Sequence, residues 1–220
     1  MTISPRPAPA LLALLAGALA AGDSSAAEFS ATLVDAAGKA VPDAVLSLAP
    51  LDAPAPAFSA PAAPVEIAQS GQQYRPFVTP VRAGTRVEFP NKDDIQHHLY
   101  SVSKPKPFEK PLYESGASET VVFDKPGVVT LGCNIHDWMV AYVVVLDTPW
   151  FAKSDAAGRA SVAGLPAGRY RLELWHPRLA APLTREIALA ADSAVSEPLE
   201  LRLKPERRIR RAPTGESRFY

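Results

Sequence analysis

Short runs of alternating apolar and polar residues recur along most of this chain. In residues 169–174, for example, the apolar positions Tyr170, Leu172 and Leu174 alternate with charged ones. A period of two residues is typical of β-strands that bury one face. No sustained helical period of 3.6 residues appears beyond the N-terminal segment, so the pattern predicts an all-β fold.

The strand signals are densest between residues 65 and 147. Runs rich in Val, Thr, Phe and Tyr are separated there by Asn, Asp, Pro and Gly, and they read YRPFVTPVRAG, TRVEFP, HHLYSVS, ETVVFD, GVVTLGC and MVAYVVVL. Roughly seven short strands in a segment of this length are typical of a β-sandwich. We therefore expect residues 65–147 to form one domain.

Two flanking regions have strand patterns of their own. Residues 28–50 predict a β-hairpin, because FSATLV and AVPDAVLSL are joined by the turn residues Asp35–Gly38. Residues 148–203 contain further turns and strands, and their DAAGRA nearly repeats the DAAGKA of the hairpin. We expect the hairpin and residues 148–203 to form one small β-sandwich that the middle domain interrupts.

Three segments lack a core-forming pattern. Residues 51–64 are rich in Pro and Ala and predict a linker. Residues 204–220 carry six basic and two acidic residues and predict a disordered basic tail. Residues 1–27 have a basic start, a short apolar stretch and then Ser25-Ala26-Ala27, which is the pattern of a signal peptide cleaved before Glu28. We therefore predict a periplasmic protein without stable membrane insertion.

The charge of the chain is balanced, with 23 basic and 23 acidic residues. This balance gives no reason to expect a nucleic-acid partner. The 23 prolines fit short strands and turns better than long helices.

Export makes the sulfur content of the chain notable. Cys133 is the single cysteine, and Met139 is the only methionine besides Met1. A lone cysteine has no internal disulfide partner in an oxidising compartment. Three explanations stay open at this point: a buried inert thiol, an intermolecular disulfide, or a metal ligand.

The neighbours of Cys133 favour a metal. Cys133, His136 and Met139 have the spacing C-x2-H-x2-M on a loop between two predicted strands. One thiolate, two imidazoles and a weak axial thioether form the donor set of electron-transfer copper sites, whereas structural zinc prefers more Cys or His donors. The second imidazole would come from His97 or His98, and alternation along a strand lets only one of them face the metal.

Residues 123–145 resemble the metal-binding region of the cupredoxins, the blue copper proteins of the plastocyanin and amicyanin type. The matching features are a Gly-led strand into C-x2-H-x2-M, then a valine-rich strand, with FPN and His97-His98-Leu99 upstream. The resemblance implies a Greek-key cupredoxin β-sandwich over residues 65–146 and one copper ion. Its implied ligands are His97, Cys133, His136 and Met139, with His98 standing where the family has asparagine.

The combination of FPN, HHLYS and LGCNIHDWM also resembles exported proteins labelled methylamine utilisation proteins. In those proteins a carboxypeptidase-regulatory-like (transthyretin-like) β-domain accompanies the cupredoxin domain. The resemblance therefore implies a domain of that kind in residues 148–203, where the sequence reads GLPAGRYRLELWHP.

From these features we expect a periplasmic type 1-like copper protein that carries single electrons and is not an enzyme. Its partner would be a c-type cytochrome or a periplasmic dehydrogenase. Copper delivery without electron transfer is one alternative, and a structural envelope protein with a buried Cys133 is another. Asp93 and Asp94 are expected to be turn residues, and His176 a surface or interdomain histidine.

Trp138 and Ile135, beside the predicted ligands, have two open interpretations. They are either core residues or an apolar rim on which a partner docks.

Overall fold

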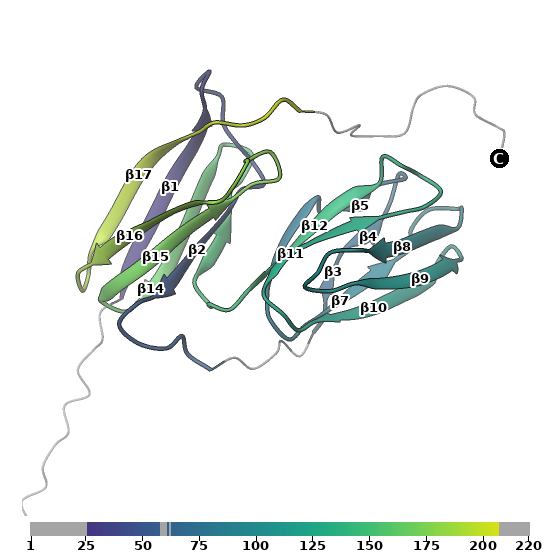
Figure 1. The fold of residues 1–220 in the computed structure, drawn as a ribbon, viewed down its shortest axis with the longest axis horizontal. Helices are drawn as coiled ribbons and strands as arrows, with labels where there is room; N and C mark the ends of the chain where they lie inside the picture. The colour runs from purple at the N-terminus through teal and green to yellow at the C-terminus, as the bar shows by residue number, and fades with distance from the viewer. Residues whose placement is uncertain (1–25, 58–60, 62, 207–220) are drawn as a thin grey trace, which may run out of the picture.

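The computed structural model describes residues 26–57, 61 and 63–206, and all helical or extended elements in these residues are β-strands (Figure 1). The all-β prediction is thereby confirmed for the described part of the chain. The strands form two β-sandwiches that lie side by side. We call the strands between residues 65 and 146 the central sandwich. We call the strands in residues 27–50 and 151–201 the discontinuous sandwich, because they come from both ends of the described chain.

The central sandwich packs a five-stranded sheet against a three-stranded one. The larger sheet has the order β6 (Val78–Arg82), β12 (Val140–Leu146), β11 (Gly127–Gly132), β8 (His97–Ser101) and β9 (Phe108–Tyr113). The smaller sheet has the order β10 (Ser118–Phe123), β7 (Thr85–Pro90) and β3 (Val65–Glu66). A separate ribbon pairs β4 (Ala68–Gln69) with β5 (Tyr74–Arg75). Residues such as Phe89, Phe123 and Leu131 form the core between the sheets.

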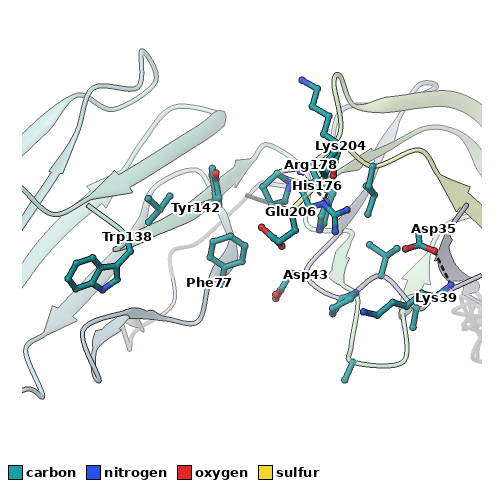
Figure 2. Close-up of a pocket in the computed structure, with 18 of the residues that line it drawn as sticks. Asp35, Lys39, Asp43, Phe77, Trp138, Tyr142, His176, Arg178, Lys204 and Glu206 are labelled. Atoms are coloured by element: carbon teal, nitrogen blue, oxygen red, sulfur yellow. Dashed lines mark hydrogen bonds between the residues drawn. The ribbon is translucent and has the colours of Figure 1, made fainter. Parts of the chain in front are cut away.

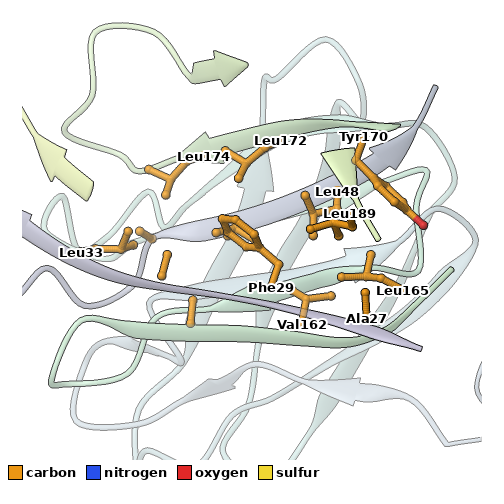
Figure 3. Close-up of a cluster of buried hydrophobic side chains, with 14 of the residues drawn as sticks. Ala27, Phe29, Leu33, Leu48, Val162, Leu165, Tyr170, Leu172, Leu174 and Leu189 are labelled. Atoms are coloured by element: carbon orange, nitrogen blue, oxygen red, sulfur yellow. The ribbon is translucent and has the colours of Figure 1, made fainter. Parts of the chain in front are cut away.

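The discontinuous sandwich combines a three-stranded and a four-stranded sheet. The orders are β14 (Arg159–Leu165), β1 (Ala27–Asp35), β17 (Ala194–Leu201), and β13 (Phe151–Lys153), β2 (Val45–Pro50), β15 (Gly168–Trp175), β16 (Leu183–Leu189). Phe29 and Leu33 of β1 point at Leu172 and Leu174 of β15 across the core (Figure 3). The predicted alternation in β15 is confirmed, since Tyr170, Leu172 and Leu174 are buried while Arg169 and Arg171 are exposed.

The two DAAG sequences fold into the same turn. The Asp35 Oδ1 atom accepts hydrogen bonds from the N–H groups of Ala37 and Lys39 at 2.9 and 3.0 Å. Asp155 Oδ1 does the same with Ala157 and Arg159, at 2.9 Å each. Both turns close on a glycine with positive φ, Gly38 at 76° and Gly158 at 75°. The sequence repeat therefore reflects one local solution used twice.

The predicted hairpin over residues 28–50 is wrong, although its turn is present. β1 and β2 lie in different sheets, and a single bridge, Val34 to Ala40, links the chain on either side of the turn. Both edges of β1 are already paired, with β14 on one side and β17 on the other. The chain after the turn therefore crosses to the opposite sheet, where β2 pairs with β13 and β15.

Strand β9 is not among the predicted strands, and its sequence contains a proline. Pro111 removes a backbone donor, yet β9 is an edge strand of its sheet, where a missing donor is tolerated.

Two predicted boundaries also differ from the structure. Ala27, assigned to the signal peptide, is buried in β1 opposite Leu165. Lys204, assigned to the tail, exchanges hydrogen bonds with Arg178. The remainder of both segments, residues 1–25 and 207–220, lies outside the described residues.

The two sandwiches meet through a small apolar cluster. Val78 and Val144 of the central sandwich pack with Val45 of the discontinuous one. The Tyr142 ring lies edge-on to Trp175, with centroids 5.4 Å apart, and Lys153 Nζ donates to the Val78 carbonyl at 2.9 Å. In the described residues there is no helix long and apolar enough to pass through a bilayer.

Candidate metal centre

The loop from Cys133 to Met139 joins two neighbouring antiparallel strands. β11 ends at Gly132 and β12 begins at Val140, and these two residues are paired. The Met139 N–H donates to the His136 carbonyl at 2.9 Å, which closes the loop into a tight turn. Cys133 is 3% exposed and Met139 1% exposed, and both belong to the core of the central sandwich. The loop therefore turns its two sulfur side chains inward.

The fold brings His97 to this loop from a distant part of the sequence. Its strand β8 lies next to β11, where Tyr100 pairs with Gly132. One ligand atom each of His97, Cys133 and His136 lie within 4.8 Å of one another. The Cys133 sulfur is 3.8 Å from His136 Nδ1, and the two imidazole rings have centroids 5.0 Å apart. Three of the four predicted ligands thus converge on one point.

The His97 ring is held with one nitrogen toward a carboxylate and the other without a partner. Its Nε2 atom lies 2.8 Å from Asp93 Oδ2, and the side chain is 0% exposed. Its Nδ1 atom is buried and has no hydrogen-bond partner among the described residues. A carboxylate on one ring nitrogen commonly orients a histidine whose other nitrogen binds a metal. The buried Nδ1 is therefore an available metal ligand.

Asp93 is held in place by the ribbon of β4 and β5. Its carboxylate accepts hydrogen bonds from the N–H groups of Gly71 and Gln72 at 2.5 and 2.9 Å. Burial raises the pKa of Asp93, but the bonds from Gln72, His97 and Gly71 outweigh burial and lower the pKa overall. The carboxylate therefore stays ionised and continues to accept a hydrogen bond from the His97 ring.

His98 faces away from this cluster. Its Nε2 atom lies 3.0 Å from Glu109 Oε1 on β9, and its ring packs against Tyr100. Consecutive residues of a strand point to opposite sides, so His97 and His98 have different surroundings. Of the two histidines that the sequence offered, the structure brings His97 to Cys133 and His136.

His136 is the ligand candidate closest to solvent. Its ring is half-buried, and the adjacent Ile135 is 48% exposed. Burial and the nearby His97 lower the pKa of His136. A lower pKa favours the neutral imidazole, which is the form that binds metals.

Tyr74 ties the two ligand-bearing segments together. Its hydroxyl lies 2.9 Å from the Gly132 carbonyl, beside Cys133, and 3.2 Å from the His98 carbonyl, beside His97. Burial raises the pKa of Tyr74 well above its ordinary value, so the hydroxyl remains a donor. Gln69 Nε2 also lies 3.3 Å from the His98 carbonyl. Both residues come from the β4–β5 ribbon.

Sequence reasoning missed two supporting residues. Asp93 was expected to be a turn residue only, although its spacing of four positions from His97 was a readable signal. Tyr74 had no local signal, because its partners are far away in the sequence.

Trp138 is half-buried, packs beside the core and donates from Nε1 to the Gln72 carbonyl at 3.1 Å. His176 is not part of the cluster and lies between the sandwiches.

The donor set fits a copper ion. It offers one thiol sulfur and two imidazoles within reach of one another, with the thioether of Met139 buried in the same core. Soft sulfur together with imidazole is the combination that copper prefers among the biological metals. The buried, unpartnered Nδ1 of His97 is also explained if it binds a metal.

Comparison with protein-family models gives no match, and comparison with curated proteins gives none either. The solved structures that are similar to part of this chain include the following three. A copper-containing nitrite reductase from Thermus scotoductus SA-01 is 29% identical, with a TM-score of 0.37, over 44% of this chain. A purple cupredoxin from Nitrosopumilus maritimus is 26% identical, with a TM-score of 0.34, over 37% of this chain and 99% of its own. An oxidised amicyanin variant is 19% identical, with a TM-score of 0.36, over 38% of this chain and 82% of its own.

The chain spans only about a quarter of the nitrite reductase, 25% of its length. TM-scores below 0.5 do not establish a shared activity. The conclusion about function therefore has to come from the residues of the site itself.

Proposed function

We propose that this protein is a periplasmic, type 1-like copper protein of the cupredoxin kind that carries single electrons. The observation that carries the proposal is the convergence of His97, Cys133 and His136 within 4.8 Å, with the His97 Nδ1 atom buried and unpartnered. Copper bound there would supply a one-electron couple. The Cys133 thiolate and the two imidazoles would hold the ion, and Met139 would be the weak fourth ligand.

The surroundings of the cluster suit an electron carrier. The ligands lie at the ends of paired strands, and Asp93 and Tyr74 fix the two segments that supply them. A site held in this way changes little when the charge of its ion changes, which favours fast electron transfer. The half-buried His136 ring beside exposed Ile135 offers a short route to a partner, for which we propose a c-type cytochrome or a periplasmic dehydrogenase.

Other proposed roles find less support in the site. Copper storage would be favoured if His98 also bound the metal, but the His98 ring lies against Glu109 instead. A cysteine nucleophile would need a third group to orient His136. Asp93, whose charge acts on His136, is engaged by His97 and by two backbone N–H groups.

We also propose that the discontinuous sandwich is a carboxypeptidase-regulatory-like domain.

The experiment is a titration of the purified mature chain with Cu(II), followed by visible and EPR spectroscopy. We expect an intense thiolate-to-copper absorption that Cys133→Ser and His97→Ala abolish and that His98→Ala retains. Absence of copper uptake by the parent protein would refute the proposal. If the coloured protein forms but exchanges no electrons with reduced cytochrome c, storage replaces electron transfer as the function.

A further inference from the structure

The hairpin turn between β4 and β5 contacts the groups that support both predicted imidazole ligands. It runs from Ser70 to Gln73 and is closed by the hydrogen bond from the Ser70 N–H to the Gln73 carbonyl at 2.9 Å. Its two central residues are Gly71 and Gln72, with φ of 62° and 53°. A type I′ turn requires positive φ at both central residues, and glycine and asparagine adopt it more readily than glutamine does. The Gln72 backbone is therefore held in a conformation that is uncommon for its residue type.

Gln72 is joined to His97 through its backbone N–H group. This N–H donates to Asp93 Oδ2 at 2.9 Å, and His97 Nε2 lies 2.8 Å from the same oxygen. The Gly71 N–H donates to the other carboxylate oxygen, Asp93 Oδ1, at 2.5 Å. The turn therefore fixes the carboxylate that orients the His97 ring.

Gln72 is joined to His136 through its backbone carbonyl group. Trp138 Nε1 donates to this carbonyl at 3.1 Å, and the centroids of the Trp138 and His136 rings are 5.2 Å apart. The His136 ring also lies near the His97 ring, with centroids 5.0 Å apart. One of the two aromatic rings beside His136 is therefore held by Gln72.

The Trp138 ring is not fixed by packing alone. It is half-buried beside the core and lines the cleft between the two sandwiches. Figure 2 shows that it stands apart from His176 and Arg178 of the discontinuous sandwich. The hydrogen bond to Gln72 therefore restricts a ring that the core covers only in part.

The ribbon that carries the turn is itself attached to the segment before His97. The Lys92 N–H donates to the Gln69 carbonyl at 2.8 Å, and Gln69 forms a parallel bridge with Asn91. These are backbone contacts that need no metal. The turn can therefore hold its position in the metal-free protein.

We propose that Gln72 is a positioning residue of the metal centre, and that the Gly71–Gln72 turn orients both imidazole ligands before a metal binds. We rely here on the proposed function, which makes His97 and His136 ligands of a copper ion. The turn acts on one ring through a carboxylate and on the other through an indole, so displacing the turn releases both rings together. Uncommon backbone conformations of this kind persist where several contacts enforce them, and they are frequent at functional sites.

The first test displaces the turn without removing a side-chain contact. In Gly71→Val a β-branched residue has to adopt a φ of 62°, although the nearest atom to its Cβ, on the Arg75 side chain, is 3.7 Å away. We expect copper affinity to fall about tenfold or more and the visible and EPR spectra to change. Gly71→Asn should restore most of the affinity, because asparagine tolerates positive φ.

Gly84→Val is the matched control. Gly84 also has positive φ, at 92°, and a Cβ there would meet nothing within 4 Å. Its turn joins β6 to β7 at the end of the sandwich opposite the ligand loop, where the Ala83 N–H donates to the Leu146 carbonyl. We expect this variant to keep the copper affinity and the spectra of the parent protein.

The second test is a double-mutant cycle on copper affinity. Asp93→Asn removes the support of His97, and Trp138→Phe keeps an aromatic ring beside His136 but loses the bond to Gln72. We expect each change to lower the affinity about tenfold or more. Because Gln72 links the two supports, the double variant should lose less than the product of the two single losses.

NMR of the metal-free protein distinguishes a failure of this positioning role from a failure of the proposed function. Relaxation of the Trp138 indole N–H and of the His136 ring measures how rigidly each is held. We expect both rings to become more mobile in Gly71→Val and to remain as in the parent in Gly84→Val. This measurement decides the role of the turn even if the parent protein takes up no copper.

The positioning role is overturned if the two rings keep their parent mobility in Gly71→Val. It is also overturned if Gly71→Val and Gly84→Val bind copper equally well, or if the losses of Asp93→Asn and Trp138→Phe multiply. Circular dichroism shows whether each variant folds, and the double-mutant cycle decides alone if Gly71→Val does not.

Discussion

The Asp93 carboxylate holds three donors at once: the backbone N–H groups of Gly71 and Gln72 and the ring of His97. In Asp93→Asn an NH2 group replaces one of the two carboxylate oxygens. Whichever way the amide is turned, this NH2 group faces one of the donors that the oxygen accepted from. We expect a loss of about 1–3 kcal/mol in the free energy of unfolding. We also expect copper affinity to fall about 10- to 100-fold, because His97 loses its orientation. Urea unfolding and competition with a copper chelator measure the two effects.

Asp94→Asn provides the matched control for this variant. Asp94 is exposed, follows Asp93 directly and loses the same charge, but its side chain has no hydrogen bond or ion pair with the described residues. Equal losses of copper affinity in both variants would show that net charge, and not the orientation of His97, sets the affinity.

At the scale of single residues, the candidate metal site was only partly predictable from the sequence. Cys133, His136 and Met139 could be recognised because they share one loop. Strand alternation showed that only one of His97 and His98 could face the metal, and the family resemblance favoured His97. Tyr74 could not be recognised, because its role depends on where the β4–β5 ribbon lies relative to β8 and β11. Such contacts depend on tertiary structure and leave no local pattern.

At the scale of elements, the two DAAG turns provide a matched pair of glycines. A Cβ atom on Gly158 would lie 2.3 Å from the Leu33 carbonyl oxygen, whereas one on Gly38 would meet nothing within 4 Å. Both residues have positive φ, so alanine costs about 1 kcal/mol at either position. We expect Gly38→Ala to lose only that amount and Gly158→Ala to lose about 2–4 kcal/mol. Urea unfolding tests this difference.

Equal destabilisation by the two alanines would mean that β1 does not pack against the second turn as described. The same turns show where local sequence stops being informative. DAAG predicts a turn correctly in both places, but it does not determine which strand pairs with which. β1 finds its partners in β14 and β17, far along the sequence, and so residues 28–50 do not close as a hairpin.

At the scale of the whole molecule, the buried His176 makes stability depend on pH. Burial lowers its pKa to about 4 in the folded protein, from 6.5 in the unfolded chain. Between these values the unfolded chain binds a proton that the folded protein does not, so stability falls as pH decreases from 6.5 towards 4. The loss is at most about 3 kcal/mol. Urea unfolding of metal-free protein at pH 7 and 5 measures it.

His176→Gln should remove most of this slope. The charged groups that face His176 are Arg178, Asp43 and Glu206, and all three remain in the variant. His136 titrates in the same direction and is also unchanged, so its contribution cancels in the difference between the two proteins. An identical slope in parent and variant would refute the assignment to His176.

The predicted ligands and the residues that support them all belong to the central sandwich. Asp93, Tyr74 and Gln69 are within it, as are His97 and the loop from Cys133 to Met139. Its apolar core is likewise formed by residues between Val65 and Val145. The discontinuous sandwich contributes to its stability mainly through the cluster of Val45, Val78 and Val144 and through the Lys153 bond to Val78.

We therefore expect the excised segment 64–147 to fold and to give the same copper spectrum as the whole chain. Its free energy of unfolding should be lower, because Val78 and Val144 lose their apolar partners and become exposed, at about 25 cal/mol per Å². Val78→Thr in the excised segment should leave the spectrum unchanged, since Val78 belongs to the cluster between the sandwiches and not to the core that contains Cys133 and Met139. A segment that folds but binds copper with an altered spectrum would show that the discontinuous sandwich helps to shape the site.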